Sequence, residues 1–539
     1  MPLLRSASGR TPLFAALRQA ARRAAGTPWT GAAAQASPPV SRRAFLRSGA
    51  LVAGGALLTP TLAGCLPRLT GAAAPRIAVV GAGLAGLAAA WHLHRAGLEA
   101  TVYEASARAG GRVHTGYGVV AEGQPTELGA EFIDSAHADV RALCTHFGLA
   151  LLDRHAGPAA GLRTGYFFGG RHYSERDVVT AFTPAAGRVA ADLARAETDP
   201  AEAARLDRRS VAAYLDGLGL DAWLRALLGV AFVTEYGLDE DEQSALNFLY
   251  TIGTDLADGF AVFGESDERF KIAGGNERLP AALAGALGDA LRYGHFLEAV
   301  RAEGAGFRLA FQTDGGAREL AADVLVLALP LPLLRALDLR VPLPGPQRRA
   351  FAEAGFGTNA KTFAGMRRRP WRAAGFSGET FSDEPFQLLW DPQELEAGEA
   401  AGLTFFSGGT AGLRVGEGPP EAQVARLLPG AERAFPGTAA AFTGRAARFH
   451  WPSHAFTRGS YTCFRPGQWT GLAEHLRTPA GALFFAGEHC SLEHQGYMNG
   501  AAESGREAAV AIARRLRRRL PPLALASPAG SGAAAGAAA

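Results

Sequence analysis

Lysine is almost absent from this sequence. The 539-residue chain has 54 basic residues, and only Lys271 and Lys361 among them are lysines. A chain that uses arginine nearly everywhere else is expected to keep lysine where a compact ammonium with an adjustable pKa is needed. Cysteine is scarce as well, without the C-x-x-C spacing of zinc sites, so we expect neither a disulfide scaffold nor a metal centre. The four cysteines are Cys65, Cys144, Cys463 and Cys490.

Charge of either sign is limited, at 19% of residues against 48% hydrophobic. This composition excludes a wholly disordered chain, a coiled coil and a collagen-like fibre, and the length predicts two or three domains. Residues 1–64 hold eight arginines and no acidic residue, which leaves 46 basic residues against 51 acidic ones in the remainder. A mildly acidic body gives no reason to expect a nucleic acid partner.

Long apolar runs are missing after residue 64. Before it, the Arg42-Arg43 pair precedes a small and apolar stretch from Gly49 to Gly64, which resembles a twin-arginine export signal. Leu62-Ala63-Gly64-Cys65 is similar to a bacterial lipobox, in which Cys65 would be lipidated. We therefore expect residues 1–64 to be a signal peptide read by the Tat machinery, and the body to be periplasmic or a lipid-anchored protein. An uncleaved membrane anchor is the alternative, although about 20 residues are needed for a span.

The sequence that follows the signal has the complete fingerprint of a dinucleotide site. Arg76 to Val80 is predicted to be a buried parallel strand, and the glycine-rich turn Gly81-Ala82-Gly83-Leu84-Ala85-Gly86 follows it at once. A helix is predicted from Leu87 to Arg95, and a second strand from Ala100 to Tyr103 ends in Glu104.

Each part of that fingerprint has a physical role. Gly81 permits the tight turn, Gly83 lets the backbone approach a pyrophosphate, and Gly86 lets the helix pack closely on the strand. The helix start then faces the phosphates, and Glu104 would accept hydrogen bonds from ribose hydroxyls.

The sequence has one such fingerprint, which alone would also fit an NAD dehydrogenase. Two further features favour FAD. Gly110-Gly111-Arg112-Val113 offers a second backbone and arginine approach to the diphosphate. Phe485-Ala486-Gly487-Glu488 precedes a long predicted helix, from Gly500 to Leu516, whose start could face the flavin ring.

At this point the chain resembles the flavin-containing amine oxidases, the family of monoamine and polyamine oxidases with their L-amino-acid oxidase relatives. The resemblance covers nearly all of residues 75–515 and is carried jointly by six stretches: Val79–Thr115, Glu127–Asp134, Phe270–Gly275, Asn359–Phe363, Trp451–Gly467 and Leu483–Glu507.

The resemblance implies an α/β fold in which a Rossmann-like FAD-binding domain of the glutathione-reductase and monoamine-oxidase type carries an inserted α+β substrate domain. The implied FAD segments are residues 75–150, 267–345 and 453–518. The implied substrate domain comprises residues 151–266 and 346–452, with a mainly helical part from about Arg154 to Thr251. Residues 520–539 are predicted to be a disordered tail.

The same resemblance implies a set of FAD-binding residues, with FAD as the cofactor. They are Gly81, Gly83, Leu84, Ala85, Gly86, Glu104, Ala105, Gly111, Arg112, Gly129, Ala130, Glu131, Phe132, Val300, Trp451, Gly487, Glu488, Tyr497 and Met498.

Three residues match the catalytic positions of the family. Tyr461 and Tyr497 match two aromatic rings that stand beside the flavin and align an amine between them; the alternative is two ordinary core tyrosines. Lys361 matches the lysine that holds a water against flavin N5, and the alternative is a surface lysine. The flavin itself would take the hydride, so general acid–base machinery is not required.

Two departures from relatives refine the expectation. Ser460 stands where some animal monoamine oxidases have the cysteine that bonds the flavin, so FAD should be non-covalent. Phe132 stands near the position where L-amino-acid oxidases bind the substrate carboxylate with arginine, which favours amines without a carboxylate.

The sequence therefore predicts an exported amine oxidase that uses dioxygen and forms hydrogen peroxide. Three rivals remain: an L-amino-acid oxidase with its arginine elsewhere, a flavin dehydrogenase that passes electrons to a quinone or cytochrome, and a flavin-stabilised binding protein. The five arginines at positions 514–519 fit a solvated helix end, although contact with anionic lipid is an alternative.

Overall fold

A computed structural model describes residues 74–252 and 266–523, apart from Ala397 and Ala400. The predicted signal peptide, the lipobox with Cys65 and most of the predicted tail lie outside these residues. Within the described residues, no helix has the length and apolar character needed to cross a membrane. Cys144, Cys463 and Cys490 are buried.

The dinucleotide fingerprint lies on a five-stranded parallel sheet with the strand order β20-β13-β1-β2-β9. Segments far apart in the chain meet in this sheet, and they come from all three of the predicted FAD segments. The strands are β1 (Ile77–Val80), β2 (Ala100–Tyr103), β9 (Leu291–Arg292), β13 (Val324–Leu327) and β20 (Leu483–Phe485). The domain boundaries themselves stay predictions.

Two long helices cross on this sheet. α3 (Leu84–Arg95) follows β1, and α18 (Met498–Arg515) follows β20 after a short loop. They approach closely because α18 has Gly505 at the crossing, where a Cβ would lie 2.3 Å from the carbonyl oxygen of Ala85. The helices α4 (Ala138–His146) and α10 (Arg278–Leu287) complete this part. Both long helices begin within three residues of where the sequence predicts them.

A four-stranded sheet and two hairpin-sized sheets extend the same part of the molecule. The four-stranded sheet has the order β12-β11-β10-β14, from β10 (Phe296–Glu303), β11 (Gly306–Thr313), β12 (Gly316–Ala322) and β14 (Asp338–Arg340). The small sheets pair β3 (Thr115–Tyr117) with β4 (Pro125–Glu127) and β5 (Leu151–Asp153) with β8 (Phe270–Ile272). The helices α11 (Leu331–Ala336) and α12 (Gly345–Glu353) flank β14 along the chain.

The second large sheet has seven strands in the order β19-β15-β18-β17-β16-β6-β7. They are β6 (Arg163–Phe168), β7 (Arg171–Tyr173), β15 (Ala360–Met366), β16 (Phe376–Ser382), β17 (Leu388–Trp390), β18 (Ala401–Ser407) and β19 (Phe442–His450). Four helices of this region are α13 (Pro370–Ala373), α14 (Gly409–Arg414), α15 (Pro420–Ala434) and α16 (Thr438–Ala441).

The region from about Arg154 to Thr251 is mainly helical, as the sequence predicts, because five helices between Glu175 and Ile252 occupy most of it. Two strands that the sequence analysis did not predict, β6 and β7, precede these helices. Tyr166 and Phe167 pair in parallel with Phe381 and Ser382 of β16, more than 200 residues later. A strand whose partner lies that far away gives little local signal, because its hydrogen bonds and buried face exist only in the assembled sheet.

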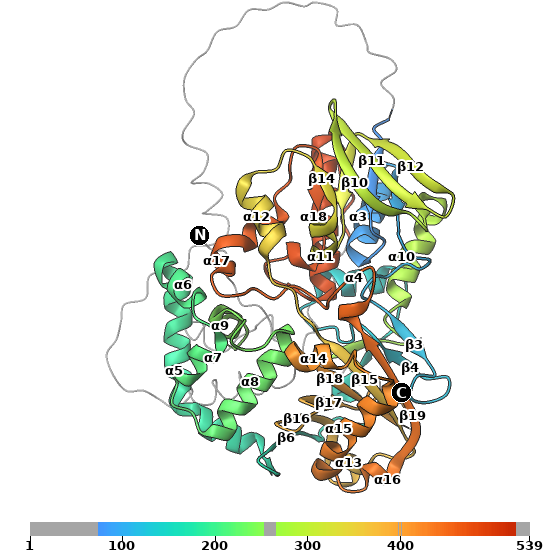
Figure 1. The fold of residues 1–539 in the computed structure, drawn as a ribbon. Helices are drawn as coiled ribbons and strands as arrows, with labels where there is room; N and C mark the ends of the chain where they lie inside the picture. The colour runs from blue at the N-terminus through green and yellow to red at the C-terminus, as the bar shows by residue number, and fades with distance from the viewer. Residues whose placement is uncertain (1–73, 253–265, 397, 400, 524–539) are drawn as a thin grey trace, which may run out of the picture. The chain divides into compact units, whose positions relative to one another are not determined.

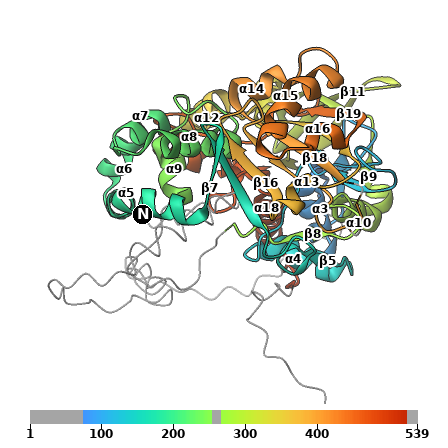
Figure 2. The same ribbon diagram turned by 90° about the horizontal axis from the view of Figure 1, so that it is seen from below.

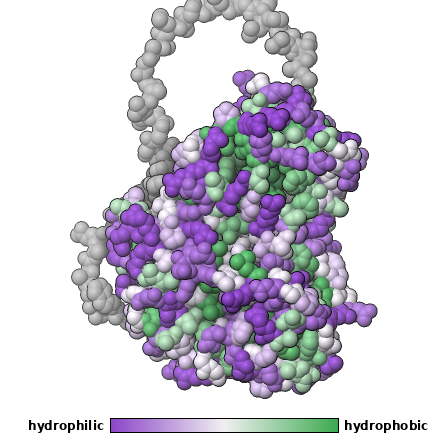
Figure 3. Space-filling model, in the orientation of Figure 1, coloured by the Kyte–Doolittle hydropathy of each residue, from purple (hydrophilic) through white to green (hydrophobic). Residues whose placement is uncertain are grey.

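Five helices form a layer at one side of the molecule in both ribbon views (Figures 1 and 2). The longest begins with a capping box, in which Ser174 and Asp177 satisfy each other's backbone N–H groups. The five are α5 (Glu175–Thr198), α6 (Pro200–Asp207), α7 (Val211–Asp216), α8 (Ala222–Tyr236) and α9 (Ala245–Ile252). The face shown in Figure 3 is mostly hydrophilic, with apolar side chains in scattered patches.

Short elements lie on either side of the segment that carries Ser460 and Tyr461. The last strand of the seven leads through a short 3-10 turn at Trp451–Ser453 into the segment that carries Ser460 and Tyr461. α17 (Gln468–Leu472) follows and leads toward β20. The α/β architecture, with a parallel dinucleotide-binding sheet and a second mixed region, is confirmed.

Candidate active site

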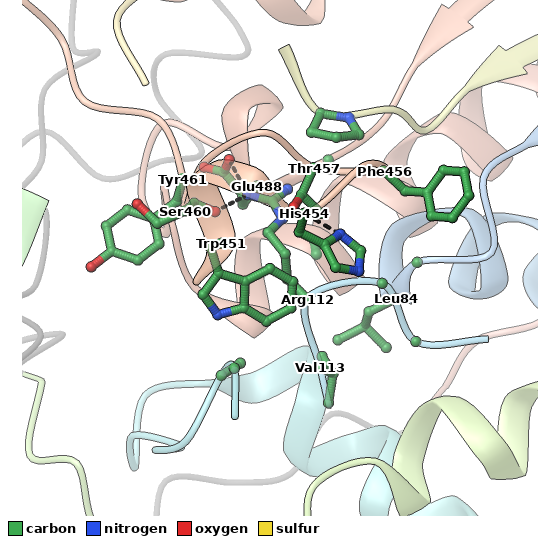
Figure 4. Close-up of a pocket in the computed structure, with 18 of the residues that line it drawn as sticks. Leu84, Arg112, Val113, Trp451, His454, Phe456, Thr457, Ser460, Tyr461 and Glu488 are labelled. Atoms are coloured by element: carbon green, nitrogen blue, oxygen red, sulfur yellow. Dashed lines mark hydrogen bonds and ion pairs between the residues drawn. The ribbon is translucent and has the colours of Figure 1, made fainter. Parts of the chain in front are cut away.

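A cavity of about 790 Å³ lies between the carboxyl ends of the parallel strands and the seven-stranded sheet. Its lining runs from the glycine turn after β1 to Lys361 on β15 and Trp390 on β17. Ligands of open parallel sheets bind at this edge, because the loops that leave the strands open a crevice there. Figure 4 shows part of its wall, with Arg112 and Trp451 near the centre.

The three glycines of the fingerprint perform three different tasks. Gly81 has a φ of +102°, and a Cβ there would lie 2.5 Å from the carbonyl oxygen of Ala328. At Gly86 a Cβ would lie 2.0 Å from the carbonyl oxygen of Gly81, so only glycine lets the helix approach the strand. At Gly83 a Cβ would meet nothing within 4 Å, which leaves open space before the start of α3. That space, beside unsatisfied N–H groups, is suited to a diphosphate.

Glu104 closes the fingerprint at the end of β2. One carboxylate oxygen accepts the backbone N–H of Ala82 at 2.7 Å, and the other accepts the backbone N–H and the hydroxyl of Ser106, each at 2.8 Å. These bonds fix the carboxylate at the cavity wall. A carboxylate has about four acceptor positions, so it can still accept a hydrogen bond from a ribose hydroxyl.

Arg112 joins segments that are almost 400 residues apart. Its Nη1 donates to Glu488 Oε1 at 2.9 Å and to the carbonyl oxygen of Ser460 at 2.8 Å (Figure 4). Glu488 is 3% exposed, and it also accepts the backbone N–H groups of Thr462 and Gly496. A buried carboxylate so fully bonded is stable as an anion, and it holds the C-terminal segment against the middle of the cavity.

The two lysines of the chain meet at one carboxylate. Lys361 Nζ lies 2.7 Å from Glu131 Oε2, and Lys271 Nζ lies 2.9 Å from Glu131 Oε1. Trp390 Nε1 donates to the same Oε1 at 3.0 Å. Burial alone would raise the pKa of Glu131, but the two ammonium groups hold it at about 2. Because a buried charge must be paired, the two lysines and Glu131 depend on one another in the folded protein.

Lys361 has two further acceptors, the carbonyl oxygens of Glu127 and Gly129, each at 2.9 Å. An ammonium group has three N–H donors, and all three of these contacts lie on the Glu127–Glu131 segment. Lys361 therefore ties β15 to the loop that follows β4. It also lines the cavity, so its role in holding a water stays a prediction.

The aromatic residues gather in the same cavity. Tyr461 and Tyr497 both line it, as do Phe132, Trp390 and Phe406. The Tyr497 ring packs edge-on against His137, with the ring centroids 5.0 Å apart. The rings give this part of the cavity an apolar wall with electron-rich faces, which suits an amine. The pairing of the two tyrosines as a cage stays a prediction.

The end of the cavity beside Phe132 is acidic. Glu235, Glu268 and Glu379 line it, and each is buried. Burial raises the pKa of Glu379 to about 8 and raises the pKa of Glu268 well above its ordinary value. The sequence did not indicate these carboxylates, because they lie on α8, on the segment before β8 and on β16, and no local motif contains them.

An arginine lies behind this end. The Arg154 guanidinium stacks on the Phe132 ring, 4.2 Å from its centroid. It pairs with three carboxylates: Glu394, Glu268 at 3.6 Å and Glu379 at 3.7 Å. Arg154 therefore neutralises part of the acidic cluster and has no surplus charge to offer a substrate carboxylate.

Most of the predicted FAD-binding residues line the cavity, and two do not. Gly86 packs against the Gly81 turn, as its predicted role requires. Val300 is fully buried on β10, while Leu297 and Glu298 of the same strand line the cavity instead. Lining residues that sequence analysis missed include Thr234, Glu235, Glu268, Glu379, Trp390 and Phe406.

Ser460 is held as a structural hydroxyl. Its Oγ donates to Asn359 Oδ1 at 2.7 Å, and the residue is 3% exposed. A hydroxyl in this position has no thiol chemistry to offer the flavin, which supports the prediction of non-covalent FAD without testing it.

Comparison with known proteins decides the family. The family model of flavin containing amine oxidoreductases matches residues 84–513. The chain belongs to this family. It is therefore an oxidoreductase that acts on amines, and its cofactor is FAD.

Relatives of several activities share most of the chain. A Mycobacterium tuberculosis protein assigned as a flavin-containing monoamine oxidase is 28% identical over 81% of this chain and 96% of its own length. An L-amino acid dehydrogenase of Synechocystis is 24% identical over 80% of this chain and 94% of its own. Among solved structures, cyclohexylamine oxidase from Brevibacterium oxydans is 26% identical, with a TM-score of 0.71 over 82% of this chain and all of that one. Putrescine oxidase bound to putrescine, at 23% identity and a TM-score of 0.70, shows the same fold over 82% of this chain and 99% of its own.

The residues of this chain fit FAD. The open space at Gly83 accepts a diphosphate, and Glu104 stands one strand away at the position of a ribose partner. Arg112 and Glu488 line the same cavity, as do Tyr461 and Tyr497. An elongated cofactor can thus run from the glycine turn to the tyrosines, with the acidic end left for substrate.

Proposed function

We propose that this protein oxidises a primary amine that carries no carboxylate, giving an aldehyde, ammonia and hydrogen peroxide. In the balanced reaction the amine R–CH2–NH2 is oxidised by dioxygen, with one water consumed and one hydrogen peroxide formed. When bound, FAD supplies the acceptor for the hydride of the amine α-carbon.

One observation carries the preference for an amine. Three buried carboxylates line the cavity end beside Phe132, and the nearby guanidinium of Arg154 already binds Glu268, Glu379 and Glu394. A substrate carboxylate would be buried there without a free cationic partner, because Arg154 is already paired, and burying an unpaired charge is costly. An amine can instead form hydrogen bonds with the carboxyl groups that line this end.

The chain's own residues then prepare the amine. The rings of Tyr461, Tyr497, Trp390 and Phe406 exclude water from the wall and hold the apolar part of the substrate. An arriving ammonium can pass a proton to a cavity carboxyl group only when that group is ionised. The pKa of Glu379, about 8, leaves a minor ionised fraction at neutral pH that grows as the pH approaches 8. The neutral amine is the form from which hydride loss is possible.

A second candidate is oxidation of L-amino acids. It is favoured by the position of Arg154, directly over Phe132, where a shift of its carboxylate partners would free a guanidinium. A quinone or cytochrome in place of dioxygen as electron acceptor is the further alternative.

We also propose that the body acts outside the cytoplasm. Support comes from the twin-arginine pattern around Arg42-Arg43 and from the lipobox-like Leu62–Cys65, which would make Cys65 the lipidated N-terminus. Mass spectrometry of the N-terminal peptide from isolated membranes tests this, since an intact Met1 would contradict it.

The function is tested by anaerobic mixing of the FAD-loaded protein with matched substrate pairs. 2-Phenylethylamine and L-phenylalanine differ only in the carboxylate, and hexylamine and 1,6-diaminohexane differ only in a second amino group. We expect the amines to bleach the flavin absorbance, and air to restore it with one hydrogen peroxide per turnover. Bleaching by phenylalanine alone would replace the proposal by the amino acid oxidase. If the flavin absorbance recovers only slowly in air and a quinone accelerates the recovery, the electron acceptor would be a quinone and not dioxygen.

A further inference from the structure

A second cavity, of about 470 Å³, lies at the end of α18. It shares no lining residue with the large cavity, so it is a separate site. Its walls are His92 of α3, four residues of α18 (Arg506, Val510, Ala513 and Arg514) and the segment that follows it, with Arg518, Arg519 and Leu520–Leu523. Four of these are arginines, which makes the cavity strongly basic.

Three of the arginines carry uncompensated charge. Arg514, Arg518 and Arg519 are exposed and form no ion pair with any residue that the structure describes. Arg506 differs, because it is bidentate on Asp139, with its Nη2 at 3.0 Å from Oδ2. Unpaired arginines around one cavity repel each other, and an anion in their midst relieves that repulsion.

A buried histidine forms the floor of the cavity. His92 is 2% exposed and lines the cavity, and its Nδ1 has no hydrogen-bond partner among the described residues. Burial, with the charges of Arg95 and Arg506, lowers the pKa of His92 to about 3. The imidazole is therefore neutral, and an unsatisfied buried nitrogen beside free guanidinium groups points to a ligand rather than to a solvated helix end.

The position of this cavity in the fold is defined by the parallel sheet. Arg515 donates to the carbonyl oxygen of Gly481, just before β20 begins, and Arg95 at the end of α3 donates to the carbonyl oxygen of Pro522. Since β20, β13 and β1 are parallel, this is also the edge at which Arg76 leads into β1. The large cavity opens at the opposite edge.

We propose that this basic cavity binds the phosphate group of an anionic phospholipid, and so seats the body on a membrane surface. Free phosphate shares the chemistry, but the location favours lipid. Arg76 follows Cys65 by a segment that can extend no more than about 40 Å, so a lipid on Cys65 would keep this edge close to the bilayer. The opposite edge, with the amine-oxidising cavity, then faces the aqueous side.

The test uses the FAD-loaded full chain carrying Cys65→Ser, so that no acyl chain contributes to binding. Binding is measured by cosedimentation with vesicles of phosphatidylcholine alone and of an equimolar mixture with phosphatidylglycerol. A photoactivatable phosphatidylglycerol then maps the contact by mass spectrometry. We expect binding that depends on phosphatidylglycerol and crosslinks within residues 506–523. Crosslinks confined to residues before Arg76 would overturn the proposal.

Two variants separate a built site from diffuse charge. Arg514→Gln with Arg518→Gln and Arg519→Gln should weaken phosphatidylglycerol binding about 100-fold, at about fivefold for each arginine. Val510→Trp keeps every arginine but fills the cavity, and it should also abolish the crosslinks at 506–523. Unchanged crosslinking in Val510→Trp would show surface charge without a site and would refute the cavity.

A matched control loses the same charge elsewhere. Arg176→Gln, Arg414→Gln and Arg426→Gln are exposed positions on α5, α14 and α15, and together they should change binding by less than about threefold. Equal loss of phosphatidylglycerol binding in the two triple variants would contradict the proposal. A calorimetric titration with inorganic phosphate distinguishes the sources, since saturable phosphate binding without preference for phosphatidylglycerol vesicles would replace lipid by free phosphate. Amine oxidation should be unchanged in all of these variants.

Discussion

The two ends of the large cavity are built on different principles. The cofactor end consists of backbone geometry: a glycine turn, a helix start and Glu104, all within 30 residues of one another. The substrate end consists of buried charges on separate elements, with Glu131 between two lysines and Glu379 beside Arg154. The first kind of site is fixed by local chain sterics, and the second exists only when distant strands meet.

Substitutions at the two ends of the large cavity are therefore expected to have different effects. A change at the cofactor end should remove the flavin, because there is no alternative way to place the backbone. A change at the substrate end should leave the flavin bound but should alter stability, rate or pH dependence, because it removes one partner from a charge network.

The largest effect is expected at Gly86. In Gly86→Ala the new Cβ would lie 2.0 Å from the Gly81 carbonyl oxygen, so the turn and α3 must move apart. We expect loss of at least nine tenths of the bound flavin, measured as the ratio of flavin to protein absorbance. Gly187→Ala on α5 is the control, since its Cβ meets nothing and should stabilise the helix by about 0.5–1 kcal/mol. Full flavin content in Gly86→Ala would refute the packing argument.

The next largest effect is expected at Glu131. Glu131→Gln leaves Lys271 and Lys361 buried without their shared carboxylate, which should lower the free energy of unfolding by about 3–5 kcal/mol. Denaturant unfolding at neutral pH measures this. The exposed pair of Arg349 and Glu353 provides the control, and Glu353→Gln should cost less than about 1 kcal/mol. A similar loss of unfolding free energy in both variants would contradict the dependence of the two buried lysines on Glu131.

A smaller effect, on rate rather than stability, is expected at Tyr497. Tyr497→Ala should retain the flavin but lower the turnover of amines about 100-fold, because the substrate loses its alignment. Stopped-flow reduction of the flavin measures it, with Tyr117→Ala, at an exposed tyrosine, as the control. Loss of flavin from Tyr497→Ala would assign this ring to cofactor binding instead.

The smallest effect is the pH dependence at Glu379. Its pKa is about 8 in the folded protein and about 4.5 in an exposed chain, so the folded state binds the proton more tightly. The stabilisation is present below pH 4.5 and is lost as the pH rises to about 8. In Glu379→Gln the thermal midpoint should decline less between pH 5 and 8, because the variant has no carboxyl group at this position that loses its proton in that range. If the thermal midpoint of Glu379→Gln declines with pH as steeply as before, the decline would be assigned to Glu127, whose pKa is also raised, to about 7.

Sequence reasoning and structure agree where chemistry is local. The strand from Ile77 to Val80, the glycine turn and the strand ending before Glu104 were all predicted within a few residues, because sterics alone require that pattern. The pairing of Arg112 with Glu488 could be anticipated only through the family resemblance. The strands β6 and β7 were missed, because their partner β16 is distant in sequence.

By itself, the sequence determined the dinucleotide turn, the FAD class and the isolation of two lysines among 54 basic residues. It could not show that both lysines share Glu131. Nor could it show that Arg154 stacks on Phe132 and pairs with three carboxylates, or that unpaired arginines line the same cavity as His92. The reason is physical. Glycine conformation and helix starts are properties of neighbouring residues, whereas the charge of a buried group depends on partners that only the assembled sheets bring within hydrogen-bond distance.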